Sequence, residues 1–228
     1  MRKIVNLISL LLICLAFTSC VDYVQSVTFK NGKYHMYYKV TLSKLLFAMA
    51  DEDPEEIFMD FDEEEIGELP PNISIKPVNT ELEVGAEFTF EIDPKTTDET
   101  EKSYLPTVAG KKCFIPFLLG QNDSISDSVG FDSEGEEFAA AIMASAKCRI
   151  LLSKKLIPEI EAAYFEGKGG QNFSIPVFDY GEANCLEIPF IILTQEGMYR
   201  TDRVVIIKNK YKSGDNKNET FNRNRHAE

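Results

Sequence analysis

Two strand-like segments near the start of the chain flank the dipeptide Asn31-Gly32. Both central residues of a tight hairpin turn need positive φ, and Asn-Gly adopts that conformation at low cost. Apolar side chains recur at every second position of the second segment: Tyr34, Met36, Tyr38, Val40 and Leu42. Successive side chains of a strand point to opposite faces, so these five share one face. The pattern predicts an antiparallel hairpin over residues 23–42 with one buried face.

Helix-start signals follow at four places. Ser and Asp are favoured as N-caps, Pro is favoured at the first helical position, and a Ser-x-x-Glu capping box satisfies two free backbone N–H groups. The four predicted helices are residues 44–50 after Ser43, 53–61 from Asp53-Pro54, 133–147 from the Ser133/Glu136 box, and 158–165 from Pro158-Glu159. We expect them to pack on one face of a sheet.

Further strand-like segments occupy the rest of the chain. They are rich in β-branched and aromatic residues and are separated by turn residues such as Gly110 and Gly197. The predicted strands are residues 73–78, 87–93, 104–108, 113–119, 173–180, 184–194 and 198–208. Residues 148–154 are compatible with a strand or with the last turns of the preceding helix. Pro116 and Pro189 lie inside apolar runs, which places them on edge strands or at bulges.

The predicted fold class is α+β, with antiparallel β-hairpins and a few helices packed on one face. One domain is expected over residues 20–208, because a chain with 44% hydrophobic residues can bury a core. Residues 209–228 are polar and lack an apolar period, so they are predicted to form a disordered tail.

Two passages of the chain are similar to each other and suggest an internal repeat. Ser43-Lys44 aligns with Ser153-Lys154. Four later residues align with four others, with one-residue insertions: Pro106, Gly110, Cys113 and Pro116 with Pro176, Gly181, Cys185 and Pro189. One interpretation is a duplication with related halves 20–132 and 133–208. The other is a chance likeness between apolar strands that each contain a proline.

The first twenty residues carry a targeting signal. Arg2 and Lys3 precede an apolar run over residues 4–17. As a helix this run would span about 21 Å, against roughly 30 Å for the hydrocarbon core of a bilayer, so it fits a secretory signal peptide. Thr18-Ser19-Cys20 then resembles the lipobox of bacterial membrane lipoproteins, with Phe17 where Leu is usual.

The lipobox resemblance implies that residues 1–19 are a signal peptide and that Cys20 carries the lipid. Several acyl chains, such as palmitate, hold a protein firmly, since each buried methylene contributes about 0.8 kcal/mol. The protein is then expected in the bacterial cell envelope, on the periplasmic side or at the cell surface. The lipid-bearing cysteine, hairpin and short helix at one end and the strand pair at the other are similar to LppM-type envelope lipoproteins. This likeness covers the ends alone, and it implies no function.

The charge of the chain excludes two classes of partner. A net charge of −13 becomes −15 once Arg2 and Lys3 are removed. Nucleic-acid phosphates are bound by Lys and Arg, and anionic lipid head groups repel an acidic surface. We therefore expect no nucleic-acid partner, and we expect the membrane to be held through the lipid on Cys20.

Three cysteines follow Cys20, namely Cys113, Cys148 and Cys185. No two of them have the CxxC spacing of a redox or zinc site. Buried free cysteines behave as small apolar side chains, and that is the first interpretation. The second is a disulfide between Cys113 and Cys185, which are aligned in the repeat.

No catalytic constellation is predicted. The two histidines are His35, on the polar phase of its strand, and His226, in the tail, so a Ser or Cys nucleophile lacks a base. The eleven carboxylates of residues 51–68 indicate a solvated face, because they lack the spacing of an EF-hand loop. Three loop carboxylates are weak candidates for a cation: Asp123, Asp127 and Asp132. No other metal site and no cofactor is predicted.

These observations favour a membrane-anchored, non-enzymatic interaction module with a protein partner. The alternative is a carrier or binder of a lipid or a small apolar ligand. It is motivated by segments such as 113–119 and 190–194, which are apolar on both strand phases and could line a pocket.

Overall fold

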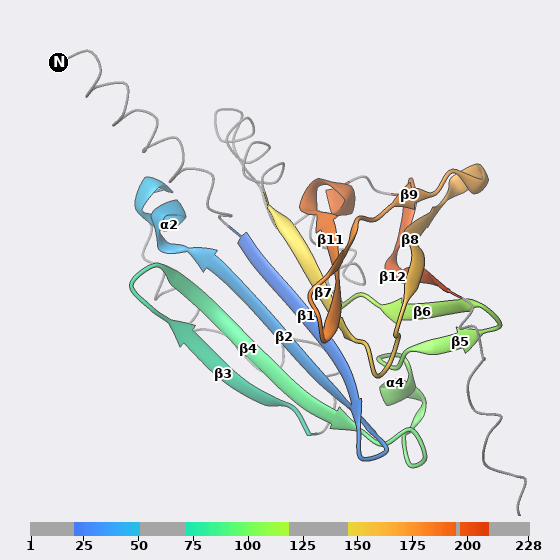
Figure 1. Ribbon diagram of the computed structural model, residues 1–228. Helices are drawn as coiled ribbons and strands as arrows, with labels where there is room; N and C mark the ends of the chain where they lie inside the picture. Colours follow the sequence, from blue (N-terminus) through green and yellow to red (C-terminus); the bar gives the residue numbers. More distant parts are fainter. Residues whose placement is uncertain (1–20, 51–71, 119–145, 195–196, 210–228) are drawn as a thin grey trace, which may run out of the picture.

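The computed structural model describes residues 21–50, 72–118, 146–194 and 197–209. Strands in these segments form two sheets, drawn in Figure 1. In spatial order the larger sheet contains β10 (Val177–Asp179), β11 (Ala183–Pro189), β7 (Lys147–Ser153), β1 (Val21–Lys30), β2 (Lys33–Ser43), β4 (Glu83–Ile92) and β3 (Ser74–Asn79). The smaller sheet contains β5 (Thr107–Ala109), β6 (Lys112–Pro116), β12 (Tyr199–Lys208), β8 (Ile160–Gly167) and β9 (Phe173–Ser174). The helical elements are α2 (Lys44–Ala50), α4 (Glu99–Lys102), η2 (Lys168–Gly170) and η3 (Phe190–Thr194).

The described part of the chain is mostly β, so the predicted α+β class, with helices packed on one face, is wrong. Residues 158–165, expected to be helical, mainly form strand β8. Their Glu and Ala residues favour helix in isolation, but Ala163 and Phe165 are buried in the core and Ala163 pairs with Ile206 of β12. Sheet pairing and burial therefore override local propensity. The expected helical residues 53–61 and 133–145, the acidic run 51–68 and the tail from residue 210 lie outside the described residues.

The first hairpin is confirmed. β1 and β2 pair antiparallel from Val21↔Leu42 to Lys30↔Lys33, and Asn31 has a φ of 54°. The helix after Ser43 is also confirmed as α2. The backbone N–H of Leu45 donates to Ser43 Oγ at 3.3 Å, which is the cap that the sequence indicates. Residues 148–154, which left two interpretations open, belong almost entirely to strand β7.

The hydrophobic core lies between the two sheets. The ring of Phe117, which follows β6, meets Tyr23 of β1 edge-on with centroids 5.5 Å apart. One polar side chain also crosses this core. Gln25 of β1 is 1% exposed and donates from Nε2 to the Pro116 carbonyl at 2.7 Å. A buried polar group needs a partner, so this bond fixes the separation of β1 and β6.

The later strands are distributed between the sheets in a way that the sequence does not reveal. The predicted strand 173–180 is divided between β9 in the smaller sheet and β10 in the larger one. The two segments around residues 195–197 also separate, because β11 joins the larger sheet and β12 the smaller. Both sheets contain strands from the suggested halves 20–132 and 133–208.

Two similar units flank β1 in the larger sheet. The first unit comprises β2, α2, β3 and β4, and the second comprises β7, the turn at residues 153–157, β10 and β11. β1 runs antiparallel to β2 and parallel to β7. The two units therefore run in opposite directions, as if rotated by half a turn about an axis through β1. Figure 1 shows them extending to opposite sides of that strand.

In the first unit the start of α2 is held against the β3–β4 turn. Ser43 pairs with Glu83 in the ladder between β2 and β4. The backbone N–H of Lys44 donates to the Leu82 carbonyl at 2.8 Å. The Lys44 ammonium donates to Asn79 Oδ1, at the end of β3, at 2.6 Å.

The second unit repeats these contacts one by one. Ser153 pairs with Ala183, and the backbone N–H of Lys154 donates to the Glu182 carbonyl at 3.0 Å. The Lys154 ammonium donates to Asp179 Oδ1 at 2.6 Å. Ser43-Lys44 and Ser153-Lys154 thus occupy equivalent places. The hairpin equivalent to β10–β11 is β3–β4, not the aligned segment 106–116, which forms β5–β6 in the smaller sheet.

Candidate functional site

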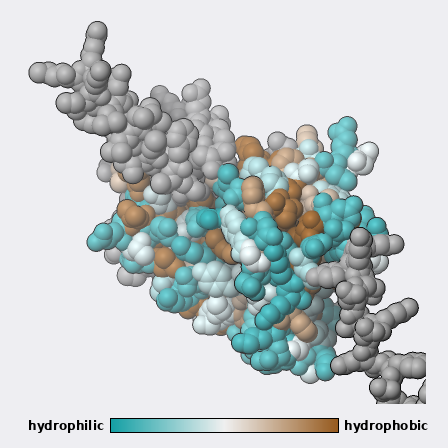
Figure 2. All heavy atoms as spheres, in the orientation of Figure 1, coloured by the Kyte–Doolittle hydropathy of each residue, from teal (hydrophilic) through white to brown (hydrophobic). Residues whose placement is uncertain are grey.

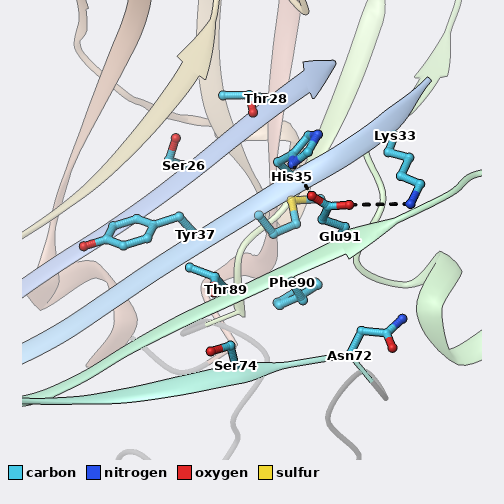
Figure 3. Close-up of a pocket in the computed structure, with 11 residues that line it drawn as sticks. Ser26, Thr28, Lys33, His35, Tyr37, Asn72, Ser74, Thr89, Phe90 and Glu91 are labelled. Atoms are coloured by element: carbon cyan, nitrogen blue, oxygen red, sulfur yellow. Dashed lines mark ion pairs between the residues drawn. The ribbon is translucent and has the colours of Figure 1, made fainter. Parts of the chain in front are cut away.

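A hollow of about 580 Å³ lies on the face of the larger sheet that points away from the core (Figure 3). Its polar lining is shared by β1, β2, β3, β4 and the residue segment just before β3: Ser26, Thr28, Lys33, His35, Tyr37, Asn72, Ser74, Thr89 and Glu91. Strand alternation explains this composition, because every second residue of these strands faces the core and the intervening residues face outward.

Four hydroxyl groups form a row across the floor of the hollow. In the strand register, Ser26 pairs with Tyr37, and Tyr37 pairs with Thr89. Thr89 in turn pairs with Ser74 at the edge of the sheet. Neighbouring strands lie about 4.8 Å apart, so the row is roughly 14 Å long and runs across the strands. We call these four residues the hydroxyl row.

One end of the hollow carries charged side chains around Glu91. His35 Nδ1 lies 2.9 Å from one carboxylate oxygen, and Lys33 Nζ lies 3.5 Å from the other. His35 Nε2 is also 3.4 Å from the Lys30 carbonyl oxygen. These groups are a third to a half exposed, so each pair contributes no more than about 1 kcal/mol to stability. The cluster instead gives this end of the hollow a fixed carboxylate and a cation.

Tyr37 keeps its phenolic proton at neutral pH. Partial burial raises the pKa of its hydroxyl, and the neighbouring carboxylate of Glu87 raises the pKa further through charge and a hydrogen bond. A protonated phenol can donate to a carboxylate and accept from a ligand. Tyr37 therefore adds an aromatic surface and a polar atom to the hydroxyl row.

The sequence indicated part of this site. It placed His35 on the polar face of its strand, and the structure agrees. The hydroxyl row was missed, because its members come from four strands and are brought together by cross-strand register. The available signal is the polar phase of each strand, for example Ser26 and Thr28 on either side of the buried Val27.

The three cysteines following Cys20 are free and buried. Cys113 belongs to the core between the sheets, whereas Cys185 lies on the opposite face of the larger sheet with Arg149 and Glu187. No Cys113–Cys185 bridge is formed among the described residues. Burial raises the pKa of Cys113 to about 11, and burial also raises the pKa of Cys148 and of Cys185. The thiols are therefore protonated at neutral pH.

No group of three or more His, Cys, Asp or Glu side chains in the described ranges has the arrangement of a metal site. Asp123, Asp127 and Asp132 lie outside these ranges, as does Cys20. Among the residues placed by the structure, no helix is long and apolar enough to cross a membrane.

The chain was compared with known proteins. No protein-family model, no curated protein and no solved structure matches it.

Proposed function

We propose that the protein is a membrane-anchored lipoprotein of the bacterial cell envelope that works as a non-enzymatic interaction module. Cys20 is the lipid-bearing residue. Support comes from the position of the next residue, because Val21 already begins β1, the central strand of the larger sheet. A lipid on Cys20 would hold this end of the sheet close to the membrane surface, with almost no linker between them.

The observation that carries the interaction function is the hydroxyl row. Ser26 lies five residues after Val21, which places the row roughly 17 Å along β1 from the anchored end. Thr28 and His35 continue the polar lining further in the same direction. The anchor and the hollow thus lie at different ends of one strand, and a partner can reach the hollow from the aqueous side.

The chemistry of the hollow favours a polar polypeptide segment as the ligand. Hydroxyl groups and the Asn72 amide offer both donors and acceptors, which suits peptide groups and uncharged polar side chains. The length of the row corresponds to about four residues of an extended chain. Both ring nitrogens of His35 have a neighbour, Glu91 on one side and the Lys30 carbonyl oxygen on the other, and these contacts hold the ring in position at one end of the hollow.

The hollow is open to solvent, and nine of the eleven residues that line it are polar, the other two being Met36 and Phe90. An apolar ligand binds best in an enclosed and mainly apolar pocket, so this open hollow fits a polar ligand better. The side chains between the sheets also pack against one another: Ile115, Phe117, Ile150, Phe165, Val204 and Ile206 are fully buried. The interaction module is therefore the function that the described residues support best.

Photo-crosslinking in intact cells of the source bacterium tests this proposal. A photoreactive residue at Thr89, in the hydroxyl row, should give an adduct of one discrete mass. The control places it at Val108, which is exposed on β5 of the smaller sheet. The adduct should be absent at Val108, and Ser74→Arg, which fills the row from its edge, should abolish the adduct at Thr89. Absence of an adduct at Thr89, or the same adduct at both positions, would contradict the proposal.

A further inference from the structure

Two leucines lie exposed at the end of the larger sheet where β1 begins. Leu82, in the β3–β4 turn, is 76% exposed, and Leu45, in the first turn of α2, is 57% exposed. Leu82 is the most exposed of the large hydrophobic residues in the described ranges. Exposed leucines in an acidic chain need an explanation, since water disfavours apolar surface.

The two leucines and the start of the chain share one edge of the fold. The hydrogen bond from Lys44 N–H to the Leu82 carbonyl, 2.8 Å long, holds the turn against α2. Val21 pairs with Leu42, only three residues before Leu45. Figure 1 shows α2, the β3–β4 turn and the start of β1 at the same end of the sheet, and Figure 2 shows apolar surface there among hydrophilic neighbours. We call Leu45 and Leu82 the leucine corner.

The second unit provides an internal comparison for this corner. The residues equivalent to Leu45 and Leu82 are Lys155 and Glu182, and both are exposed. β1 and β7 are parallel, so this second corner lies at the other end of β1. The exposed apolar residues near this second corner are aromatic: Phe178 in β10 and Tyr180 just after it. The shared backbone arrangement therefore does not require leucine, and the pair of leucines occurs beside the N-terminal end of β1.

We propose that the leucine corner inserts into the interface of a phospholipid bilayer, beside the lipid on Cys20. This proposal rests on the proposed lipid anchor. The proposed contact with the bilayer is apolar, because both lysines of this region already have partners. The Lys44 ammonium donates to Asn79 Oδ1 at 2.6 Å, and Lys39 Nζ lies 2.8 Å from a carboxylate oxygen of Glu83. Glu81 beside Leu82 is exposed, and the chain carries a net charge of −13, so zwitterionic lipids are favoured over anionic ones.

Insertion of the corner would set the orientation of the domain. A lipid anchor alone allows the domain to tilt, whereas contacts at α2 and at the β3–β4 turn add two further points at the membrane. The strands of the larger sheet would then rise from the surface, and the hydroxyl row would face the aqueous phase.

The test uses the full-length lipidated protein in phosphatidylcholine vesicles whose acyl chains carry bromine, which quenches nearby fluorophores. A bimane label is placed at position 82 through Leu82→Cys, or at the equivalent position of the second unit through Glu182→Cys. Both positions are exposed, and Cys113, Cys148 and Cys185 are buried, which limits labelling elsewhere. The label at position 82 should lose about half of its fluorescence, as expected for a group in the interface, and the label at 182 should lose none.

The outcomes separate this proposal from the anchor on which it rests. Protein that floats with the vesicles but shows equal quenching at both positions overturns the insertion and leaves the anchor intact. Protein that does not float with the vesicles overturns the anchor itself. Leu45→Lys should reduce quenching at position 82, whereas the matched change Lys155→Leu should not, and an equal effect of both changes would also overturn the proposal.

Discussion

The two units beside β1 share a backbone arrangement and differ in how deeply they are buried. In the second unit the core-facing side chains of β7 are fully buried, including Ile150 and Leu152. Their equivalents in the first unit, Val40 and Leu42, are partly exposed. In Figure 1 the smaller sheet lies alongside the second unit and leaves β3 and β4 at the far side. Tyr38 and Phe90 of the first unit still belong to the core, so the difference concerns the end of that unit where Val40 and Leu42 lie.

This difference also separates the residues expected to stabilise the fold from those proposed to bind a partner. The second unit contributes fully buried side chains such as Ile150, Leu152 and Leu186 to the core. The first unit carries the leucine corner and three of the four residues of the hydroxyl row, and the fourth, Ser26, lies on β1. Substitutions at equivalent positions should therefore have unequal effects. Four predictions test how burial is distributed, from the largest expected effect to the smallest, and three of them concern equivalent positions of the two units.

Leu152→Ala should have the largest effect, because Leu152 is fully buried and its removal leaves a cavity. We expect the free energy of unfolding to fall by about 4 kcal/mol, and by roughly half as much for Leu42→Ala. Urea unfolding followed by circular dichroism measures both values. Equal losses would show that the two units are buried alike, against the comparison.

Gly85 and Cys185 occupy equivalent places in β4 and β11. A Cβ at Gly85 would lie 2.0 Å from the Val40 carbonyl oxygen and 2.8 Å from Thr41 Cα, so the backbones approach too closely for a side chain. We expect Gly85→Ala to cost about 3 kcal/mol through overpacking, and Cys185→Ala to cost about 1 kcal/mol through lost packing. Thermal unfolding of both variants shows which substitution costs more stability. A Gly85→Ala variant as stable as the natural chain would contradict the close approach of the two backbones.

The buried thiol of Cys113 makes stability depend on pH. Its pKa is raised from 9.0 to about 11 by burial, so the unfolded chain ionises this thiol at a lower pH than the folded chain. The stabilisation is complete below pH 9.0 and is lost as pH rises to about 11. The loss is at most about 2.7 kcal/mol. Between these pH values the free energy of unfolding should fall less steeply with pH for Cys113→Ala than for the natural chain. Identical slopes would contradict the raised pKa of the Cys113 thiol.

Asn184 should give the smallest of the four effects. Its side chain is buried and donates from Nδ2 to the Ile157 carbonyl at 2.8 Å, whereas the equivalent residue of the first unit is Val84. Asn184→Val leaves that carbonyl without its donor and should cost about 1 kcal/mol. The exposed Asn209, which contacts Glu159, is the control, and its replacement by Ala should be nearly neutral. If Asn184→Val leaves the free energy of unfolding unchanged, the hydrogen bond to the Ile157 carbonyl makes no net contribution to stability.

Local features of the fold were predictable from the sequence. Asn31-Gly32 indicated the first hairpin, and Ser43 indicated the start of α2, because each signal depends on residues only a few positions apart. Residues 158–165 were predicted wrongly, because their partner β12 lies some forty residues further along the chain. The β1–β7 pairing, which joins Asp22 to Lys147, has no local signal at all.

In the candidate site, too, local features were predictable from the sequence and long-range ones were not. The exposure of His35 was predictable from strand alternation within β2. The hydroxyl row depends on the register of four strands, and a shift of one residue in any of them would turn its hydroxyl into the core. Similarity between β3–β4 and β10–β11 was also missed, although Glu87 and Glu187 stand one hundred residues apart at matching positions. The two hairpins share few residue types, and their likeness lies mainly in the backbone contacts.

The proposed lipid anchor at Cys20 underlies both the proposed orientation of the domain and the proposed role of the leucine corner. Mass spectrometry of the N-terminal peptide, taken from the membrane fraction of the source organism, tests this anchor most directly. The account predicts a peptide that begins at Cys20 and carries the mass of two or more acyl chains. A peptide that retains residues 1–19, or that begins elsewhere with an unmodified Cys20, would contradict the account.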